Sequence, residues 1–179
     1  MVNEFEILKD VVNKLGAAHI NYMLSGSIAI NYYSQPRMTR DIDIVIEIDD
    51  TNLFYGLFKN EYYINLNSVK DAVLKHGSFN IIHLEELVKI DFIVRKDSEY
   101  RKKEFERRIS INLGGQELFI VTIEDLILSK LHWAKESKSE IQLNDVKKLL
   151  AEKVDMDYIF KWAEKLEILN DLKKLLDEK

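Results

Sequence analysis

The chain has 179 residues, of which 46% are hydrophobic and 32% charged, and its formal net charge is −5 at pH 7. This composition is typical of a soluble globular protein with a sizeable core, and the excess of acid argues against a protein coated in basic surface for duplex binding. The absence of cysteine excludes disulfides and thiolate metal sites, and with no secretory signal or membrane-length apolar run we expect a cytoplasmic protein and no membrane partner.

The first elements in chain order are a helix, a strand and a second helix. Apolar residues at helical spacing predict a helix over residues 3–18 that ends near Gly16. A short apolar strand over 21–25 and a helix over 27–33 follow. A basic turn then leads to the next strand and contains Pro36, Arg37 and Arg40.

The strand predicted over residues 41–48 alternates strictly between two faces. One face carries Ile42, Ile44, Ile46 and Ile48, and the other carries Asp41, Asp43, Val45 and Glu47. Two carboxylates that point the same way raise each other's pKa unless a cation lies between them. Asp-x-Asp is therefore a natural ligand pair for a hard divalent ion such as Mg²⁺. The alternative, a strand edge kept soluble by charge, fits poorly with four isoleucines on the opposite face.

The middle of the chain predicts short helices and strands in alternation. Helices are expected over 52–58 and 68–76, and strands over 62–66, 79–83 and 87–94. In the last of these strands Asp91 lies opposite an apolar face that is formed by Val88, Ile90, Phe92 and Val94.

A basic segment and a hairpin follow. Residues 99–108 predict an exposed basic helix, and 109–113 with 117–121 predict a hairpin around Gly114-Gly115. A phosphate loop at this Gly-Gly is disfavoured because no helix begins directly after it. All six arginines lie between positions 37 and 108, which favours phosphate handling in the N-terminal part, although scattered solvated charges would give the same count.

The chain from Thr122 onward is helical by pattern, with Thr122 as a helix cap. The expected helices run over 122–136, 140–152, 155–168 and 170–178. Lys130 lies inside one apolar stripe and Asp145 lies at the edge of another. A charged group in such a place needs a partner or a ligand, so the two residues form either a structural salt bridge or part of a site. We expect Trp133 and Trp162 to belong to the core.

The order Leu24, Gly26-Ser27 and Asp41-Ile42-Asp43-Ile44 resembles the signature of the DNA polymerase β-like nucleotidyltransferase superfamily. The resemblance implies an α+β fold, with a mixed β-sheet and flanking helices as a catalytic domain over 1–121. A C-terminal helical bundle over 122–179 would complete the active-site cleft.

The same resemblance implies roles for individual residues. Asp91 matches the third carboxylate of the superfamily, and with Asp41 and Asp43 it would hold two Mg²⁺ ions. Gly26 and Ser27 would bind the phosphates of a nucleoside triphosphate (NTP), and Arg40 could reach the same phosphates.

A narrower resemblance concerns the helical part. Ile123-Glu124-Asp125-Leu126-Ile127-Leu128-Ser129-Lys130-Leu131, followed by Leu143-Asn144-Asp145-Val146, is similar to AbiEii-type and related uncharacterised bacterial nucleotidyltransferases. It implies that Lys130 contacts the nucleotide phosphates and that Asp145 supports Lys130 or the acceptor. It also raises a toxin–antitoxin role with a cognate antitoxin as partner.

The expected activity is Mg²⁺-dependent transfer of a nucleoside monophosphate from an NTP to a hydroxyl group, with release of pyrophosphate. The acceptor could be a small molecule such as an antibiotic, a tRNA end, or a protein. The alternative from another class is a catalytically inactive binding module of the same fold, acting as an antitoxin or a partner subunit.

Overall fold

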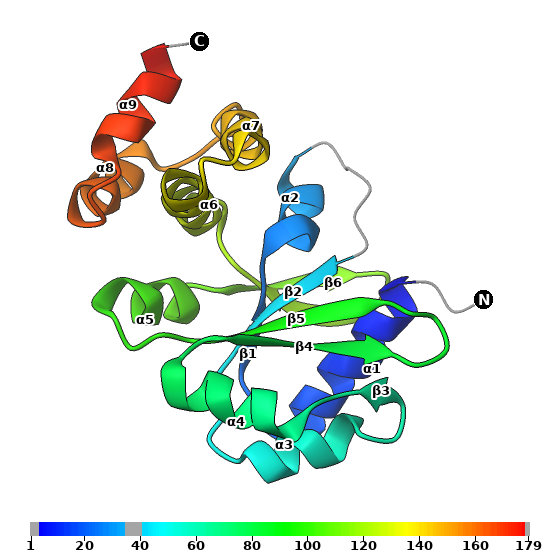
Figure 1. Cartoon of the computed structure of the whole chain (residues 1–179). Coiled ribbons are helices and arrows are strands. Elements are labelled where there is room, and N and C mark those ends of the chain that lie inside the picture. Colours follow the sequence, from blue (N-terminus) through cyan, green and yellow to red (C-terminus); the bar gives the residue numbers. More distant parts are fainter. Residues whose placement is uncertain (1–3, 35–40, 178–179) are drawn as a thin grey trace.

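The computed structural model describes residues 4–34 and 41–177 (Figure 1). Its strands are β1 (Tyr22–Leu24), β2 (Asp41–Ile46), β3 (Tyr62–Tyr63), β4 (Ser78–His83), β5 (Lys89–Val94), β6 (Ile109–Leu113) and β7 (Gln116–Ile120). Its helices are α1 (Glu4–Ala17), α2 (Gly26–Tyr33), α3 (Thr51–Phe58), α4 (Leu66–Lys75), α5 (Glu99–Glu106), α6 (Ile123–Ser137), α7 (Glu140–Leu149), α8 (Met156–Lys165) and α9 (Leu169–Asp177).

The strands form one mixed sheet in the order β3-β4-β5-β2-β1-β7-β6. β2 is parallel to β5 and antiparallel to β1, and β1 is parallel to β7. β4 pairs antiparallel with β5, and β6 and β7 form the predicted hairpin. A mixed sheet with flanking helices confirms the predicted α+β class, and it puts β2 and β5 side by side at its centre.

The apolar face of β2 and β5 packs on the side of the sheet where Figure 1 shows α1, α3 and α4. Ile44, Ile46 and Ile90 are fully buried. Phe92 lies within an aromatic cluster, with ring centroids 5.1 Å from Phe54 and 5.4 Å from Phe79. The isoleucine face predicted from alternation is thus part of the main core, and the acidic residues point to the other side.

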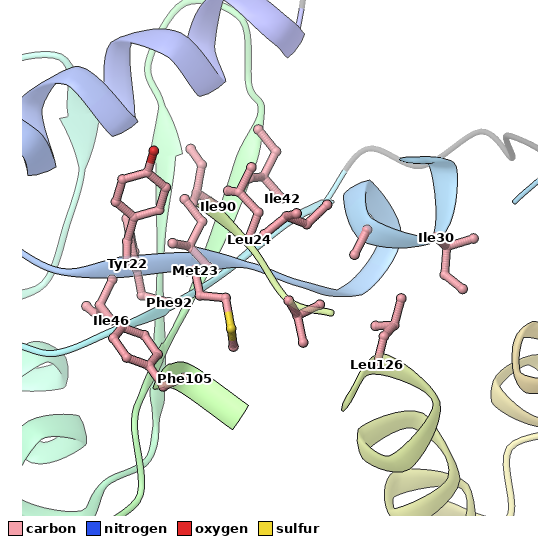
Figure 2. Packing of buried hydrophobic residues seen from close by; sticks show 14 of the residues in the cluster. Tyr22, Met23, Leu24, Ile30, Ile42, Ile46, Ile90, Phe92, Phe105 and Leu126 are labelled. Carbon is pink, nitrogen blue, oxygen red and sulfur yellow. The ribbon is translucent and has the colours of Figure 1, made fainter. Parts of the chain in front are cut away.

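The opposite side of the sheet carries α2, α5 and the C-terminal helices. Figure 2 shows Met23 on the other side of β1 from Tyr22, directed toward Phe105 of α5, and Leu126 of α6 directed toward α2. α6 packs on α2, α7 and α8. α6 therefore faces the polar side of β2 and β5 across a cleft, and α7 and α8 pack on α6.

Side-chain caps explain where several helices begin. Asp50 and Thr122 accept backbone hydrogen bonds as the N-caps of α3 and α6. Asn65 does the same for α4, accepting from the N–H groups of residues 67 and 68. Because this cap starts α4 at Leu66, the strand predicted over 62–66 is reduced to Tyr62–Tyr63.

Two predictions of side-chain environment are wrong. Trp133, expected in the core, is 57% exposed. The helix expected to be exposed over 99–108 buries Tyr100, Glu104 and Phe105.

Within residues 4–34 and 41–177, no helix combines the length and the apolar character that crossing a bilayer requires.

The aromatic cluster gives a test of the core. We expect Phe92→Ala to lower the free energy of unfolding by about 3–5 kcal/mol, because the ring leaves a cavity among neighbouring aromatic rings. Leu74→Ala, at a side chain that is 79% exposed, should change it by less than about 0.5 kcal/mol. Urea titrations of both variants measure the difference, and equal losses would contradict this packing.

Candidate active site

Two carboxylates lie side by side at the centre of the sheet. Asp43 of β2 is the direct partner of Asp91 in the parallel register between β2 and β5. Parallel neighbours present their side chains on the same face, with strands about 4.8 Å apart. Both residues line a cleft with a volume of about 650 Å³. Asp91 therefore faces the same space as Asp43, and that space is open.

The start of α2 approaches Asp43 closely. Gly26 has φ +53°, and a Cβ atom built there would lie 1.9 Å from Asp43 Oδ2. The N–H of Ser27 donates to the same oxygen at 3.4 Å, and the N–H of Ser25 donates to the Asp43 carbonyl at 3.0 Å. Glycine at position 26 thus permits both the left-handed turn and the contact between helix and carboxylate.

The Ser27 hydroxyl has a structural partner. It is buried and donates a hydrogen bond to the Asp41 carbonyl oxygen at 2.8 Å. Ser25 and Gly26, by contrast, line the cleft. In this structure the groups of the Gly-Ser turn nearest to the open space therefore come from Ser25 and Gly26.

Burial is the main cause that raises the pKa of Asp43 above its ordinary value. The hydrogen bond from the Ser27 N–H opposes this shift. The negative charges of Asp91 and Asp41 raise the pKa further, while the positive charge of Lys130 lowers it. The ionised Asp43 side chain is thus held at a cost, which a bound cation would relieve.

Lys130 enters the cleft from the opposite wall, on α6. Its side chain is only 5% exposed, and its ammonium group donates to Asp145 Oδ2 and Gln142 Oε1 of α7, each at 2.9 Å. The ion pair between helices, predicted as one alternative, is confirmed. Because Lys130 also lines the cleft, the same pair fixes a positive charge opposite the carboxylates.

The remaining predicted carboxylate, Asp41, lies at the start of β2 opposite Lys89 in the register. The Lys89 ammonium group lies 2.7 Å from Asp91 Oδ2 and 3.8 Å from Asp41 Oδ2. The hydrogen bond with Asp91 is the largest cause that raises the pKa of Lys89. Asp41 and Asp91 are therefore bridged by an ammonium group of the chain itself.

The wall between α5 and α6 is built by the buried Glu104 and the half-buried Arg101. The Arg101 guanidinium donates to Glu104 Oε2 at 2.8 Å and to Ser129 Oγ at 2.6 Å, and Ser129 donates to Glu104 Oε1 at 2.5 Å. Burial raises the pKa of Glu104, and the charge of Arg101 opposes the shift. Beyond this network the exposed ring of Trp133 also lines the cleft.

The carboxylates fit a metal ion whose remaining ligands come from water and from the phosphates of a substrate. Within the described ranges, no group of three or more His, Cys, Asp or Glu side chains is placed to hold a metal ion by itself. Asp43 and Asp91 nevertheless supply two adjacent carboxylates, and Mg²⁺ is commonly bound by one or two carboxylates together with water and substrate phosphates. The convergence of Asp41, Asp43 and Asp91 on two ions stays a prediction.

Part of this arrangement was predicted from the sequence. Asp43, Asp91 and Lys130 come together around one cleft, as predicted, and Asp145 contacts Lys130. Arg40, with Pro36 and Arg37, lies outside the described residues. The position of Lys89 could have been inferred from the parallel register, but Gln142 carries no signal in the sequence because a glutamine on a helix is usually solvated.

No family model and no curated protein matches this chain. Solved structures do resemble it. An antigenic nucleotidyltransferase-like protein from Paracoccidioides brasiliensis has a TM-score of 0.66 at 16% identity, over 97% of this chain and 87% of that one. The lincosamide antibiotic adenylyltransferase LnuA, solved with lincomycin bound, has a TM-score of 0.57 at 16% identity, over 83% and 96%.

A third similar structure is the antibiotic-resistance factor ANT(2″)-Ia, with a TM-score of 0.59 at 13% identity over 94% of this chain and 89% of that one. At such identities the likeness concerns the fold. The fold of this chain is therefore that of nucleotidyltransferase-like proteins, as the resemblance carried by Gly26-Ser27 and Asp41-Ile42-Asp43-Ile44 implied.

The close approach at Gly26 can be tested against a matched glycine. Gly115 also has a positive φ (+81°), but a Cβ there would meet nothing within 4 Å. Both alanine variants therefore carry the cost of the left-handed backbone, about 1–2 kcal/mol. We expect Gly26→Ala to lose a further 1–3 kcal/mol or so, because its Cβ displaces Asp43. Equal unfolding free energies in urea would contradict the contact.

The free-energy cost of ionising the buried Asp43 side chain gives a second test. We expect Asp43→Asn to raise the free energy of unfolding at pH 7 by roughly 1 kcal/mol, since the amide keeps the shape without the buried charge. The raised pKa means that the folded state prefers the protonated acid. The advantage of Asn should therefore shrink as the pH is lowered toward about 4.

Chemical denaturation of both proteins across this pH range measures the effect. Asp71→Asn, on an exposed side chain of α4 that pairs with the exposed Lys75, is the control and should change stability by less than about 0.5 kcal/mol at every pH. A destabilised Asp43→Asn protein at pH 7 would show that the carboxylate is stabilising, contrary to this account.

Proposed function

We propose that the chain is a nucleotidyltransferase, which transfers a nucleoside monophosphate from an NTP to a hydroxyl group and releases pyrophosphate. The observation that carries the proposal is the direct pairing of Asp43 with Asp91 at the floor of an open cleft. Lys130 faces this pair from α6. The similar fold of LnuA, an antibiotic adenylyltransferase, supports the same activity.

The triphosphate would lie between α2 and α6. The first N–H groups of α2 lie beside Asp43, and a helix N-terminus favours phosphate oxygens. Lys130 would neutralise phosphate charge from the other wall, and its hydrogen bonds to Gln142 and Asp145 would fix the direction of the ammonium group.

Asp43 and Asp91 would hold Mg²⁺ together with the phosphates, and Asp41 would contribute if a second ion binds. When bound, the metal supplies charge stabilisation at the reacting phosphate. Asp91 would also orient the acceptor hydroxyl and accept its proton, as a carboxylate at hydrogen-bond distance can do. Gly26 would keep Asp43 in place for this task by leaving room for its side chain.

A small-molecule acceptor is favoured over a tRNA end. The cleft volume, about 650 Å³, is in the range of small-molecule sites. Two arginines that could contact a nucleic-acid backbone are engaged within the fold: Arg95 pairs with Glu47, and Arg101 with Glu104. LnuA, whose fold is similar, is an adenylyltransferase of lincosamide antibiotics. A tRNA or protein acceptor, and an AbiEii-like toxin with its antitoxin, remain the less favoured proposals.

One observation favours an inactive binding module instead. Lys89 forms an ion pair with Asp91, and a permanent pair would keep the carboxylate from a metal. The affinity for NTP separates the two functions. In an enzyme it should depend on Mg²⁺ and on Asp43, whereas a module without metal chemistry has no need of either.

We expect calorimetry to detect binding of at least one NTP in the presence of Mg²⁺, and Asp43→Ala to weaken it by about 10²-fold or more. Asp71→Ala is the control, on an exposed carboxylate of α4, and should bind as the unaltered protein does. Affinity that is indifferent to Mg²⁺ and to Asp43→Ala would favour the module. Incubation with labelled NTPs and antibiotics, total tRNA or lysate then identifies the acceptor.

A further inference from the structure

The polar face of β2 and β5 carries four charged side chains in a square. The register pairs Asp41 with Lys89 and Asp43 with Asp91, and all four point to one face because residues two apart in a strand do so. Three carboxylates and one ammonium group leave two negative charges in excess. One divalent ion would balance them.

Lys89 occupies the Asp41 side of this square. Its ammonium group lies 2.7 Å from Asp91 Oδ2 and 3.8 Å from Asp41 Oδ2. A metal ion bound on that side would need the same two oxygens as ligands. An ammonium group at 2.7 Å and a metal ion at its usual 2.0–2.1 Å or so from the same oxygen would repel each other strongly.

The Asp43 side of the square is different. Asp43 and Asp91 open into the cleft together with Gly26 and Lys130, whereas Lys89 is not among the residues that line it. The position of Lys89 is fixed by the strand register and not by a flexible loop, and its side chain is 37% exposed. The ammonium group thus closes one side of the carboxylate set and leaves the other side to solvent.

We propose that Lys89 takes the place of a second metal ion on the Asp41 side, so that the chain binds one divalent ion, between Asp43 and Asp91. This inference rests on the proposed function, because it specifies how that site is charged. It departs from the two ions expected from the sequence resemblance. Lys89 would determine how many divalent ions each chain binds.

The test counts Mn²⁺ ions, which prefer the same oxygen ligands as Mg²⁺ and are visible by electron paramagnetic resonance. With a non-hydrolysable NTP analogue present to supply the phosphate ligands, we expect one bound Mn²⁺ per chain for the unaltered protein and for Lys89→Arg, which keeps the charge. Lys89→Met should bind a second ion, or bind the first about tenfold more tightly, because a positive charge a few ångströms away is removed.

Lys70→Met is the control, since Lys70 is exposed on α4, on the opposite side of the sheet (Figure 1), and it should behave as the unaltered protein. Thermal unfolding gives a second readout: Mn²⁺ should raise the melting temperature of Lys89→Met more than that of the unaltered protein. The ion count of the unaltered protein is a test by itself, so the inference does not depend on the stability of one variant.

The outcomes separate this inference from the proposed function. Two ions of similar affinity in the unaltered protein, or identical Mn²⁺ binding by Lys89→Met, would overturn the role of Lys89 and leave a metal-dependent enzyme intact. Absence of Mn²⁺ binding in all four proteins would overturn the metal role of both Lys89 and the Asp43–Asp91 pair.

Discussion

The parallel pairing of β2 with β5 is the constraint on which the site depends. It places Asp43 directly opposite Asp91, and the buried isoleucine and phenylalanine side chains on the other face hold the two strands in this register. A slip by one residue would turn the carboxylates into the core and the isoleucines into the cleft. The hydrophobic core therefore determines the chemistry of the polar face.

The second wall of the cleft is built by charges that satisfy one another. Lys130 is held by Asp145 and Gln142, and Arg101 by Glu104 and Ser129. Buried charges of this kind are strongly destabilising when one partner is lost. The helices α5, α6 and α7 are consequently locked to one another by polar contacts as well as by packing, and they hold a positive charge over the carboxylates.

Periodicity in the sequence was sufficient to predict the two faces of β2 and the cap at Thr122. The proximity of Asp91 to Asp43 was expected from the superfamily resemblance and not from periodicity. The alternation of Ile42 to Ile48 has one physical solution, a buried strand with its acids on the other face. Long-range pairing is not encoded in this way. The contact of Lys89 with Asp91 depends on which strands become neighbours, and the exposure of Trp133 depends on how α6 is oriented over the sheet. Local patterns cannot determine either.

The position of Lys130 has a consequence for how the protein folds. The cleft needs Gly26 from the start of the chain, Asp91 from the middle, and Lys130 and Asp145 from the helical part. These contacts join residues that lie far apart in the sequence, and a fold rich in such contacts forms slowly. During synthesis the sheet strands are complete once Ile120 has emerged, but the cleft cannot close before α7 has followed. A nascent chain thus acquires a sheet first and a competent site only late in its translation.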